Sequence, residues 1–182
     1  KVSLDLVNQF PDVVILNLGG GFKVARMDEE NGVDVGQVGI KLKEILSKFA
    51  LETGRELQLE LEPGTYLVAN AGILIAKIED IVDTGSKGYR FIKLNTGMND
   101  ILRPTMYGSQ HPMKVISSST KEAKYVVVGH NCESADLLSP SYGNHEQIAE
   151  RSLREASIGD LFLIGGAGAY CASMAAHGYN SF

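Results

Sequence analysis

One short segment of the chain places a thiol, two carboxylates and a hydroxyl within a few residues. Cys132, Glu133, Ser134 and Asp136 follow an apolar run at residues 125–128 that has the composition of a strand. A thiol acts as an acid or a nucleophile where its surroundings shift its pKa, and a neighbouring carboxylate can hold a substrate amine. The segment therefore predicts a site for small-molecule chemistry.

Two other kinds of site use some of the same side chains, and neither is favoured by the spacing. A metal centre would combine His130 and Cys132 with Cys171 and His177, but these intervals match no known zinc pattern. A cysteine hydrolase built on His130 and Cys132 would need a third group to orient the histidine, and none is apparent.

Two strand-to-loop transitions could bind an anion or present an acid. Residues 13–18 form an apolar run that ends in three glycines at 19–21, whose amides could approach a phosphate, although a tight turn without a ligand explains them equally well. Glu62 follows the alternating strand 57–61, at the end where parallel α/β proteins gather active-site groups. A Pro-Gly turn carrying a solvated acid is the simpler interpretation of that second feature.

A third small-residue stretch, residues 165–169, follows an apolar run and precedes Tyr170. Small residues allow backbone and ring to approach a ligand, and a core tyrosine beside a flexible loop is the competing interpretation.

Hydrophobic spacing divides the elements that carry these side chains into two parts. In the first part, Val2, Leu6 and Phe10 share a helical face, and residues 38–49 repeat the pattern before Gly54, which is placed to end a helix. With the strands at 13–18 and 57–61, this alternation predicts parallel strands joined by crossover helices, from a (β/α)₈ barrel or an open sheet.

From about residue 73 the pattern becomes that of a mostly antiparallel β domain. The expected strands are β-branched or aromatic runs at residues 73–82, 89–94, 114–117, 125–128 and 161–164. One helix is expected within this half, near residues 145–154. The boundary between the two parts is expected near Asn70.

Composition limits the classes of function. The 182 residues are 44% hydrophobic and 21% charged, which is ordinary for a soluble globular protein, and the net charge of −5 with scattered basic residues gives no footprint for nucleic acid or an anionic membrane. No apolar run approaches the roughly 20 residues of a membrane span. Two cysteines and no signal peptide favour the cytoplasm. A start at Lys1 inside a helical pattern suggests a fragment.

Six motifs, taken in order, resemble those of diaminopimelate decarboxylase and related vitamin-B6-dependent decarboxylases. They lie at residues 16–22, 62–64, 103–108, 132–136, 168–171 and 179–181. The resemblance implies an alanine-racemase-type (β/α)₈ barrel followed by a C-terminal antiparallel β domain, so that residues 1–70 would be the C-terminal portion of the barrel and residues 71–182 the β domain. It also implies pyridoxal 5'-phosphate as cofactor, conversion of meso-2,6-diaminopimelate to L-lysine and CO₂, and a homodimer with its active site at the subunit interface.

The same resemblance implies roles for individual residues. Cys132 would be the acid that returns a proton after CO₂ leaves, Glu133 would bind the distal amino group, and Arg103 with Tyr107 would hold a substrate carboxylate. The expected cofactor-binding residues are Gly20, Gly21, Glu62, Pro63, Gly64, Thr65 and Tyr170. No metal is expected.

Three departures from the family pattern bear on these expectations. Thr65 stands where most members have an arginine, which removes a cation expected to meet phosphate or substrate carboxylate. Ala135 replaces the usual glycine of the cysteine loop. The lysine that bonds the cofactor belongs to an early barrel strand with no counterpart here, so the chain alone is expected to be inactive.

Two alternatives stay open. An ornithine decarboxylase has a similar motif series but usually carries Asp after the cysteine and a Phe-Asn-Gly ending, whereas Glu133 and Tyr179-Asn180-Ser181 favour diaminopimelate. A noncatalytic homologue that binds a partner or regulates a dimer would have no reason to keep Cys132, Glu133 and Tyr170.

Overall fold

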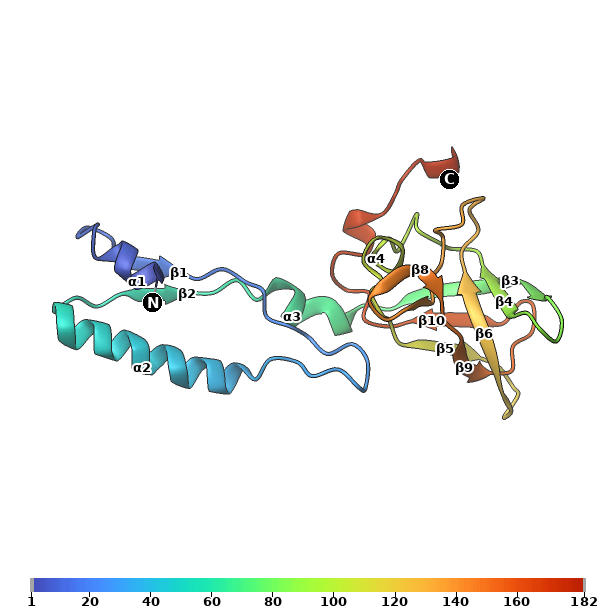
Figure 1. Cartoon of the computed structure of the whole chain (residues 1–182), viewed down its shortest axis with the longest axis horizontal. Helices are drawn as coiled ribbons and strands as arrows, with labels where there is room; N and C mark the ends of the chain where they lie inside the picture. The colour runs from blue at the N-terminus through green and yellow to red at the C-terminus, as the bar shows by residue number, and fades with distance from the viewer. Residues whose placement is uncertain (1, 182) are drawn as a thin grey trace. The chain divides into compact units, whose positions relative to one another are not determined.

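The structure, a computed structural model, describes residues 2–181 and divides the chain into two compact units (Figure 1). The first unit comprises residues 2–24 and Asn31–Tyr66. The second comprises Ala25–Glu30 and residues 67–181, so a short segment after the glycine loop belongs with the later part of the chain.

The first unit has the predicted strand, helix, strand order. β1 (Ile15–Asn17) pairs in parallel with β2 (Gln58–Glu60), and α2 (Val35–Thr53) is the crossover between them. The side chain of Asp34 caps α2 by accepting from the amide of Gln37 at 3.0 Å. Gly54 ends the helix in the left-handed conformation with φ of 70°, which confirms the predicted stop.

A small apolar core joins α2 to β1 and to the first helix, α1 (Val2–Val7). Phe49 of α2 is buried with Val7 and Leu16. The guanidinium of Arg55 donates to three carbonyl oxygens of the α1–β1 connection, with its shortest bond, 2.8 Å, to Val13. These bonds satisfy backbone oxygens that neither the helix nor the strand uses.

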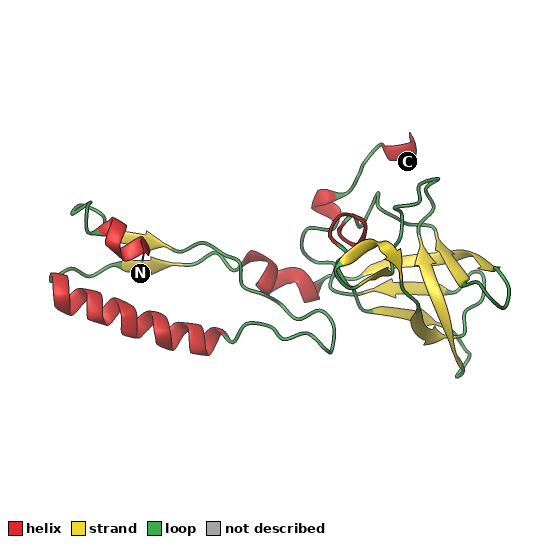
Figure 2. Ribbon diagram, viewed as in Figure 1, coloured by secondary structure: helices red, strands yellow, loops and turns green. Residues whose placement is uncertain are grey.

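The second unit is built around a six-stranded sheet with the order β5-β10-β3-β4-β6-β9 (Figure 2). Every neighbouring pair is antiparallel except β4 and β6, which are parallel. The two end strands, β5 and β9, contact each other, so the sheet curls around its core. The strands are β3 (Leu74–Asp83), β4 (Arg90–Leu94), β5 (Met113–Ile116), β6 (Glu122–Val128), β9 (Arg151–Arg154) and β10 (Leu161–Ile164).

All five strands predicted in this half are present, because each has an alternating or continuous apolar pattern that the curled sheet buries. Short helices and a hairpin complete the second unit. They are η1 (Ala69–Ala71), α4 (Arg103–Tyr107), β7 (Pro140–Ser141), β8 (Asn144–Ile148), η2 (Ala172–Met174) and η3 (Tyr179–Ser181), while α3 (Gly64–Val68) crosses the division between the units.

The helix predicted near residues 145–154 is wrong, because this segment forms β8 and β9. Pairing decides the difference: β8 is the second strand of a hairpin with β7, and β9 completes the sheet beside β6. Leu153 is buried at that edge. The helix-forming Glu, Gln and Arg residues of the segment are overridden by these tertiary contacts.

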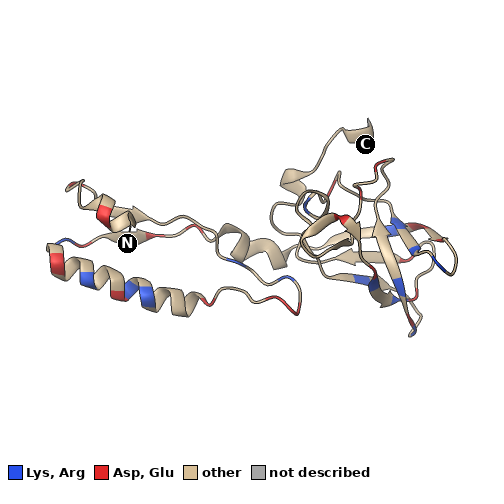
Figure 3. Ribbon diagram, viewed as in Figure 1, with Lys and Arg blue, Asp and Glu red and all other residues tan. Residues whose placement is uncertain are grey.

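Charged side chains are mixed in sign over both units, with Lys and Glu interspersed along α2 (Figure 3). None of the helices in residues 2–181 combines the length and the apolarity that crossing a membrane requires.

Phe162 of β10 is completely buried in the sheet core, whereas its neighbour Leu161 is 48% exposed. We expect Phe162→Ala to lower the free energy of unfolding of the second unit by about 3–5 kcal/mol, because the truncation leaves a cavity among packed side chains. Urea denaturation followed by circular dichroism measures the change, with Leu161→Ala as the control on the same strand. Equal losses for the two variants would contradict the assignment of the core.

Candidate functional site

The first group of predicted site residues lies where β1 and β2 end side by side. Asn17 at the end of β1 donates from its Nδ2 to the carboxylate of Glu62 at 2.8 Å, and its Oδ1 accepts from the amide of Gly19 at 2.7 Å. The amide of Glu62 donates in turn to the carbonyl of Gly19 at 2.9 Å. The acid is thus held in a defined position beside the glycine loop.

Backbone packing explains why two positions of this loop are glycine. A Cβ on Gly20 would lie 2.4 Å from the carbonyl oxygen of Glu62, and Gly21 has φ of +83°, a conformation that side chains disfavour. Within the first unit, the amides of Gly20 and Gly21 donate to no acceptor. The loop can therefore offer two donors to an anion.

Pro63, Gly64 and Thr65 continue from Glu62 into α3. The amide of Gly64 donates to the carbonyl of Glu62 at 2.8 Å, which forms a tight turn. Thr65 is partly buried and carries no charge, so this turn has an acid but no cation.

The cysteine loop follows β6 in the second unit and is organised by a buried carboxylate. Asp136 is 2% exposed and accepts from the amide of Met98 at 2.7 Å, the amide of Asn131 at 2.9 Å and the Nδ2 of Asn131 at 2.8 Å. A Cβ on Gly129 would lie only 2.1 Å from this carboxylate, and one on Gly97 would lie 2.4 Å from it. Asp136 is therefore a structural anchor, while the thiol of Cys132 is exposed.

Glu133 is held by its own loop and by the C-terminal segment. Its Oε1 accepts from the amide of Ala135 at 3.0 Å, and its Oε2 accepts from the hydroxyl of Tyr179 at 2.8 Å. The amide of Ala135, followed by the Tyr179 hydroxyl, lowers the pKa of Glu133 below its ordinary value, and the bond to Glu133 raises the pKa of Tyr179. Beside the exposed thiol, this segment presents an anion suited to an ammonium group.

Three predicted residues meet in a third group, also in the second unit. Arg103 begins α4, and its guanidinium lies 5.5 Å from the ring centroid of Tyr107 and 6.0 Å from that of Tyr170. Tyr170 is 53% exposed and has φ of 56°, so it follows the small-residue stretch as an outward-facing ring rather than a core residue. Cation and phenols together form a surface suited to a carboxylate or a phosphate.

Sequence reasoning missed two polar residues that belong to this third group. Arg26 donates from its Nε to the carbonyl of Gly166 at 3.1 Å, and His111 bonds the carbonyl of Gly165 through Nδ1 at 2.9 Å. Burial, and then the nearby guanidinium groups of Arg26 and Arg103, lower the pKa of His111 to about 4, so its ring is neutral at pH 7. Arg26 lies far from Arg103 and Tyr170 along the chain, and nothing in the pattern around His111 marks that residue as buried beside them.

The predicted residues thus form three groups in two units. Gly20, Gly21 and Glu62 belong to the first unit, and Arg103 and Cys132 with their neighbours belong to the second. Among residues 2–181, no three His, Cys, Asp or Glu side chains are arranged to hold a metal ion.

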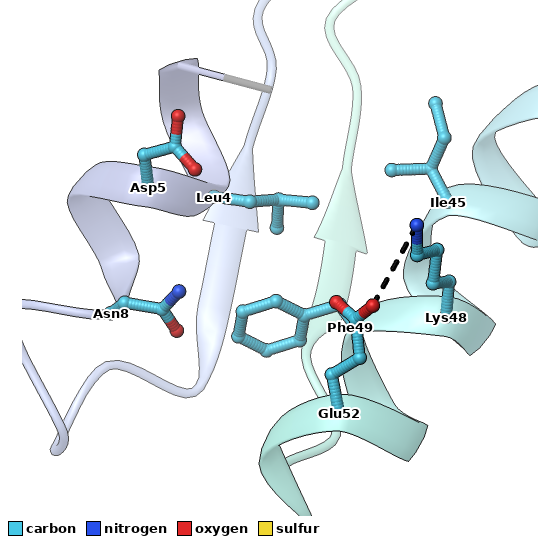
Figure 4. A pocket seen from close by; sticks show the side chains of 7 residues that line it. All are labelled: Leu4, Asp5, Asn8, Ile45, Lys48, Phe49 and Glu52. Carbon is cyan, nitrogen blue, oxygen red and sulfur yellow. Dashed lines mark ion pairs between the residues drawn. The ribbon is translucent and has the colours of Figure 1, made fainter.

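A pocket of about 430 Å³ in the first unit contains none of the predicted site residues (Figure 4). Leu4 of α1 and Phe49 of α2 point toward each other across it, and an exposed Lys48–Glu52 pair at 3.6 Å lies at its side. Its lining combines Asp5, Asn8, Lys48 and Glu52 with three apolar side chains, and we assign it no chemistry.

Comparisons with known proteins agree on one family. The model of the family described as "Pyridoxal-dependent decarboxylase, C-terminal sheet domain" matches residues 25–168. The diaminopimelate decarboxylase of Escherichia coli (strain K12) is 32% identical over 176 residues, which cover 93% of this chain and 41% of that protein. The chain therefore spans well under half the length of this relative.

Solved structures are similar over almost the whole chain. A crystal structure of diaminopimelate decarboxylase has a TM-score of 0.88 and 31% identity, covering 98% of this chain and 43% of the other. The diaminopimelate decarboxylase of M. jannaschii in co-complex with L-lysine has a TM-score of 0.82 and 27% identity, covering 99% and 38%.

The buried carboxylate predicts a large effect of a nearly isosteric change. Asp136→Asn replaces one acceptor oxygen by an amide nitrogen facing donors, and we expect it to lower the free energy of unfolding of the second unit by about 2–4 kcal/mol. Asp83→Asn, which removes an exposed partner of Arg90, is the control and should cost less than about 1 kcal/mol. Urea denaturation of both variants makes the comparison, and similar costs would contradict an anchoring role for Asp136.

The bond between Tyr179 and Glu133 predicts a change in titration. Tyr179→Phe removes one donor, so the pKa of Glu133 should rise toward its ordinary value, as measured by ¹³C NMR of the Glu133 carboxyl carbon. Because the pKa is lowered in the folded state, this anchoring of the loop is present above the ordinary carboxyl pKa and is lost as pH falls through the lowered value. Tyr89→Phe serves as the control, and an unchanged Glu133 titration in Tyr179→Phe would refute the bond.

Proposed function

Because this chain belongs to the family of pyridoxal-dependent decarboxylases and matches its C-terminal sheet domain, we propose that it is part of an enzyme that converts meso-2,6-diaminopimelate to L-lysine and CO₂. Residues 1–70 would contribute to a (β/α)₈ barrel and residues 71–182 would form the antiparallel β domain. The parallel β1–β2 pair with its crossover helix supports the first assignment.

The observation that carries the proposal is the arrangement of the cysteine loop. An exposed thiol at Cys132 adjoins Glu133, whose pKa is lowered by the Ala135 amide and the Tyr179 hydroxyl. A proton donor beside an amine-binding carboxylate is what decarboxylation of a diamino acid requires, since a proton must replace the departing CO₂ while a distal ammonium is held.

The residues of the first unit fit a pyridoxal phosphate. The free amides of Gly20 and Gly21, next to a backbone approach that excludes a Cβ, suit a phosphate group, and the fixed carboxylate of Glu62 suits a protonated ring nitrogen. Pro63, Gly64 and Thr65 would complete that side of the cofactor, and Tyr170 would contact its phosphate or ring. When bound, the cofactor supplies an electron-accepting ring for the electron pair that remains after CO₂ leaves.

The second unit would provide the groups that act on the substrate. Arg103 and Tyr107 would bind a substrate carboxylate, Glu133 the distal amino group, and Cys132 would deliver the proton to carbon. We further propose a cytoplasmic homodimer in which the cysteine loop completes the site of the partner subunit, as its exposed thiol supports.

Diaminopimelate is favoured over ornithine by Glu133 and Tyr179, which bond each other in the structure. A decarboxylase of another diamino acid is the second candidate, since Thr65 removes a cation from the turn after Glu62. A noncatalytic homologue would not need the Glu133–Tyr179 pair beside an exposed thiol.

Activity of the full-length protein that contains this chain tests the proposal. With pyridoxal phosphate it should release CO₂ from meso-diaminopimelate faster than from ornithine. Cys132→Ala should lower kcat by about a hundredfold or more, because general acid catalysis contributes that much. Cys171→Ala, which changes the buried core cysteine, is the control and should keep most of the activity.

Faster release of CO₂ from ornithine would favour the second candidate, a decarboxylase of another diamino acid. No CO₂ from either amino acid would favour the noncatalytic homologue.

A further inference from the structure

Arg26 and Arg103 place two positive charges close together in the second unit, and the carboxylate of Glu30 offsets them only in part. Within residues 2–181, no carboxylate oxygen lies at ion-pair distance from either guanidinium. The Nη2 of Arg26 and the Nε of Arg103 are buried and have no hydrogen-bond partner. Buried N–H groups of a cation are costly to leave unpaired, so this arrangement calls for an anion.

Carbonyl, hydroxyl and aromatic partners hold these guanidinium groups, and Glu30 offsets the charge of Arg26 only in part. Arg26 is fixed by its bond to the carbonyl of Gly166, and Arg103 by a 3.4 Å bond from Nη2 to the hydroxyl of Ser109 and by the two tyrosine rings. His111 is neutral and adds no charge. Burial and then the charge of Arg103 lower the pKa of Arg26, while Cys171 and Glu30 oppose this shift.

A pocket of about 250 Å³ adjoins this charge: Arg26 lines it directly, and Arg103 contacts two of its lining residues, Tyr107 and Ser109. The hydroxyl side chains of Tyr107 and Ser109 also line it and suit an oxyanion. Glu30 is the acid in its wall, and its Oε2 already accepts from the amide of Arg26 at 2.8 Å.

We propose that Arg26 and Arg103 together bind the carboxylate of the substrate that is retained in the product. This deepens the proposed function and rests on it. Two cations around the departing carboxylate would stabilise the starting state and oppose its loss, whereas two cations around the retained carboxylate bind substrate without that penalty. Arg26 thereby supplies a second cation beside Arg103.

The product of the proposed reaction, L-lysine, is the direct probe, since it keeps this carboxylate and cadaverine lacks it. Titration of L-lysine into the 182-residue chain should shift the ¹⁵N and ¹H resonances of the Arg26 Nε–H group, and cadaverine should not. Arg26→Gln should weaken L-lysine binding by about tenfold to a hundredfold, the loss expected for a charge-assisted hydrogen bond. Arg26→Lys should recover part of it, and Arg154→Gln, at an exposed arginine of β9, should change nothing.

Three outcomes would overturn the inference. The first is no shift of the Arg26 resonances with millimolar L-lysine, and the second is equal shifts with L-lysine and cadaverine. The third is tighter binding of inorganic phosphate than of L-lysine at Arg26, which would assign the two arginines to the cofactor's phosphate. Decarboxylation by the full-length protein without any Arg26 response would refute this inference alone. An Arg26-dependent L-lysine site without decarboxylation would instead refute the proposed function.

Discussion

The buried carboxylate of Asp136 fixes the cysteine loop, and the geometry of the reactive side chains in the second unit depends on it. One oxygen accepts from the Met98 amide and the other from Asn131, so the loop is tied to the segment that follows β4. Asn131 then bonds Asn99, which donates to carbonyl oxygens of the C-terminal segment, including that of Tyr179. Because the network is inside the protein, each bond holds its neighbours in place, and Cys132 and Glu133 are presented from a rigid base.

The charges of Arg26 and Arg103 are held in a different way from that of Asp136. Asp136 is an anion surrounded by donors, whereas Arg26 and Arg103 are cations that each have one buried donor without an acceptor, Nη2 of Arg26 and Nε of Arg103. Burial of these guanidinium groups is supported by carbonyl, hydroxyl and aromatic partners, which orient a charge without cancelling it. Arg26 and Arg103 therefore remain able to attract an anion from solution. Burial, and then the charges of Arg26 and Arg103, lower the pKa of His111 and keep its ring neutral.

In the first unit, backbone amides rather than side chains are the donors available to an anion. Parallel pairing of β1 and β2 brings the glycine loop against the turn at Glu62, and Gly20 allows an approach that any Cβ would block. The free amides and the acid held by Asn17 are then the available polar groups. Gly97 and Gly129 likewise leave room for the carboxylate of Asp136, which a Cβ at either position would clash with.

Local patterns in the sequence determined the helix that Asp34 and Gly54 delimit and the apolar strands of both units. They also determined which residues were candidates, namely Cys132, Glu62 and Arg103. Capping, alternation and motifs are each carried by neighbouring residues, so the sequence alone was enough for these results. Tertiary structure alone decided that residues 145–154 form strands, that Asp136 is an anchor rather than a reactive acid, and that Arg26 joins Arg103. These outcomes depend on pairing, burial and charge between residues far apart in the chain, and no local pattern encodes the partner that a strand edge or a buried charge will meet.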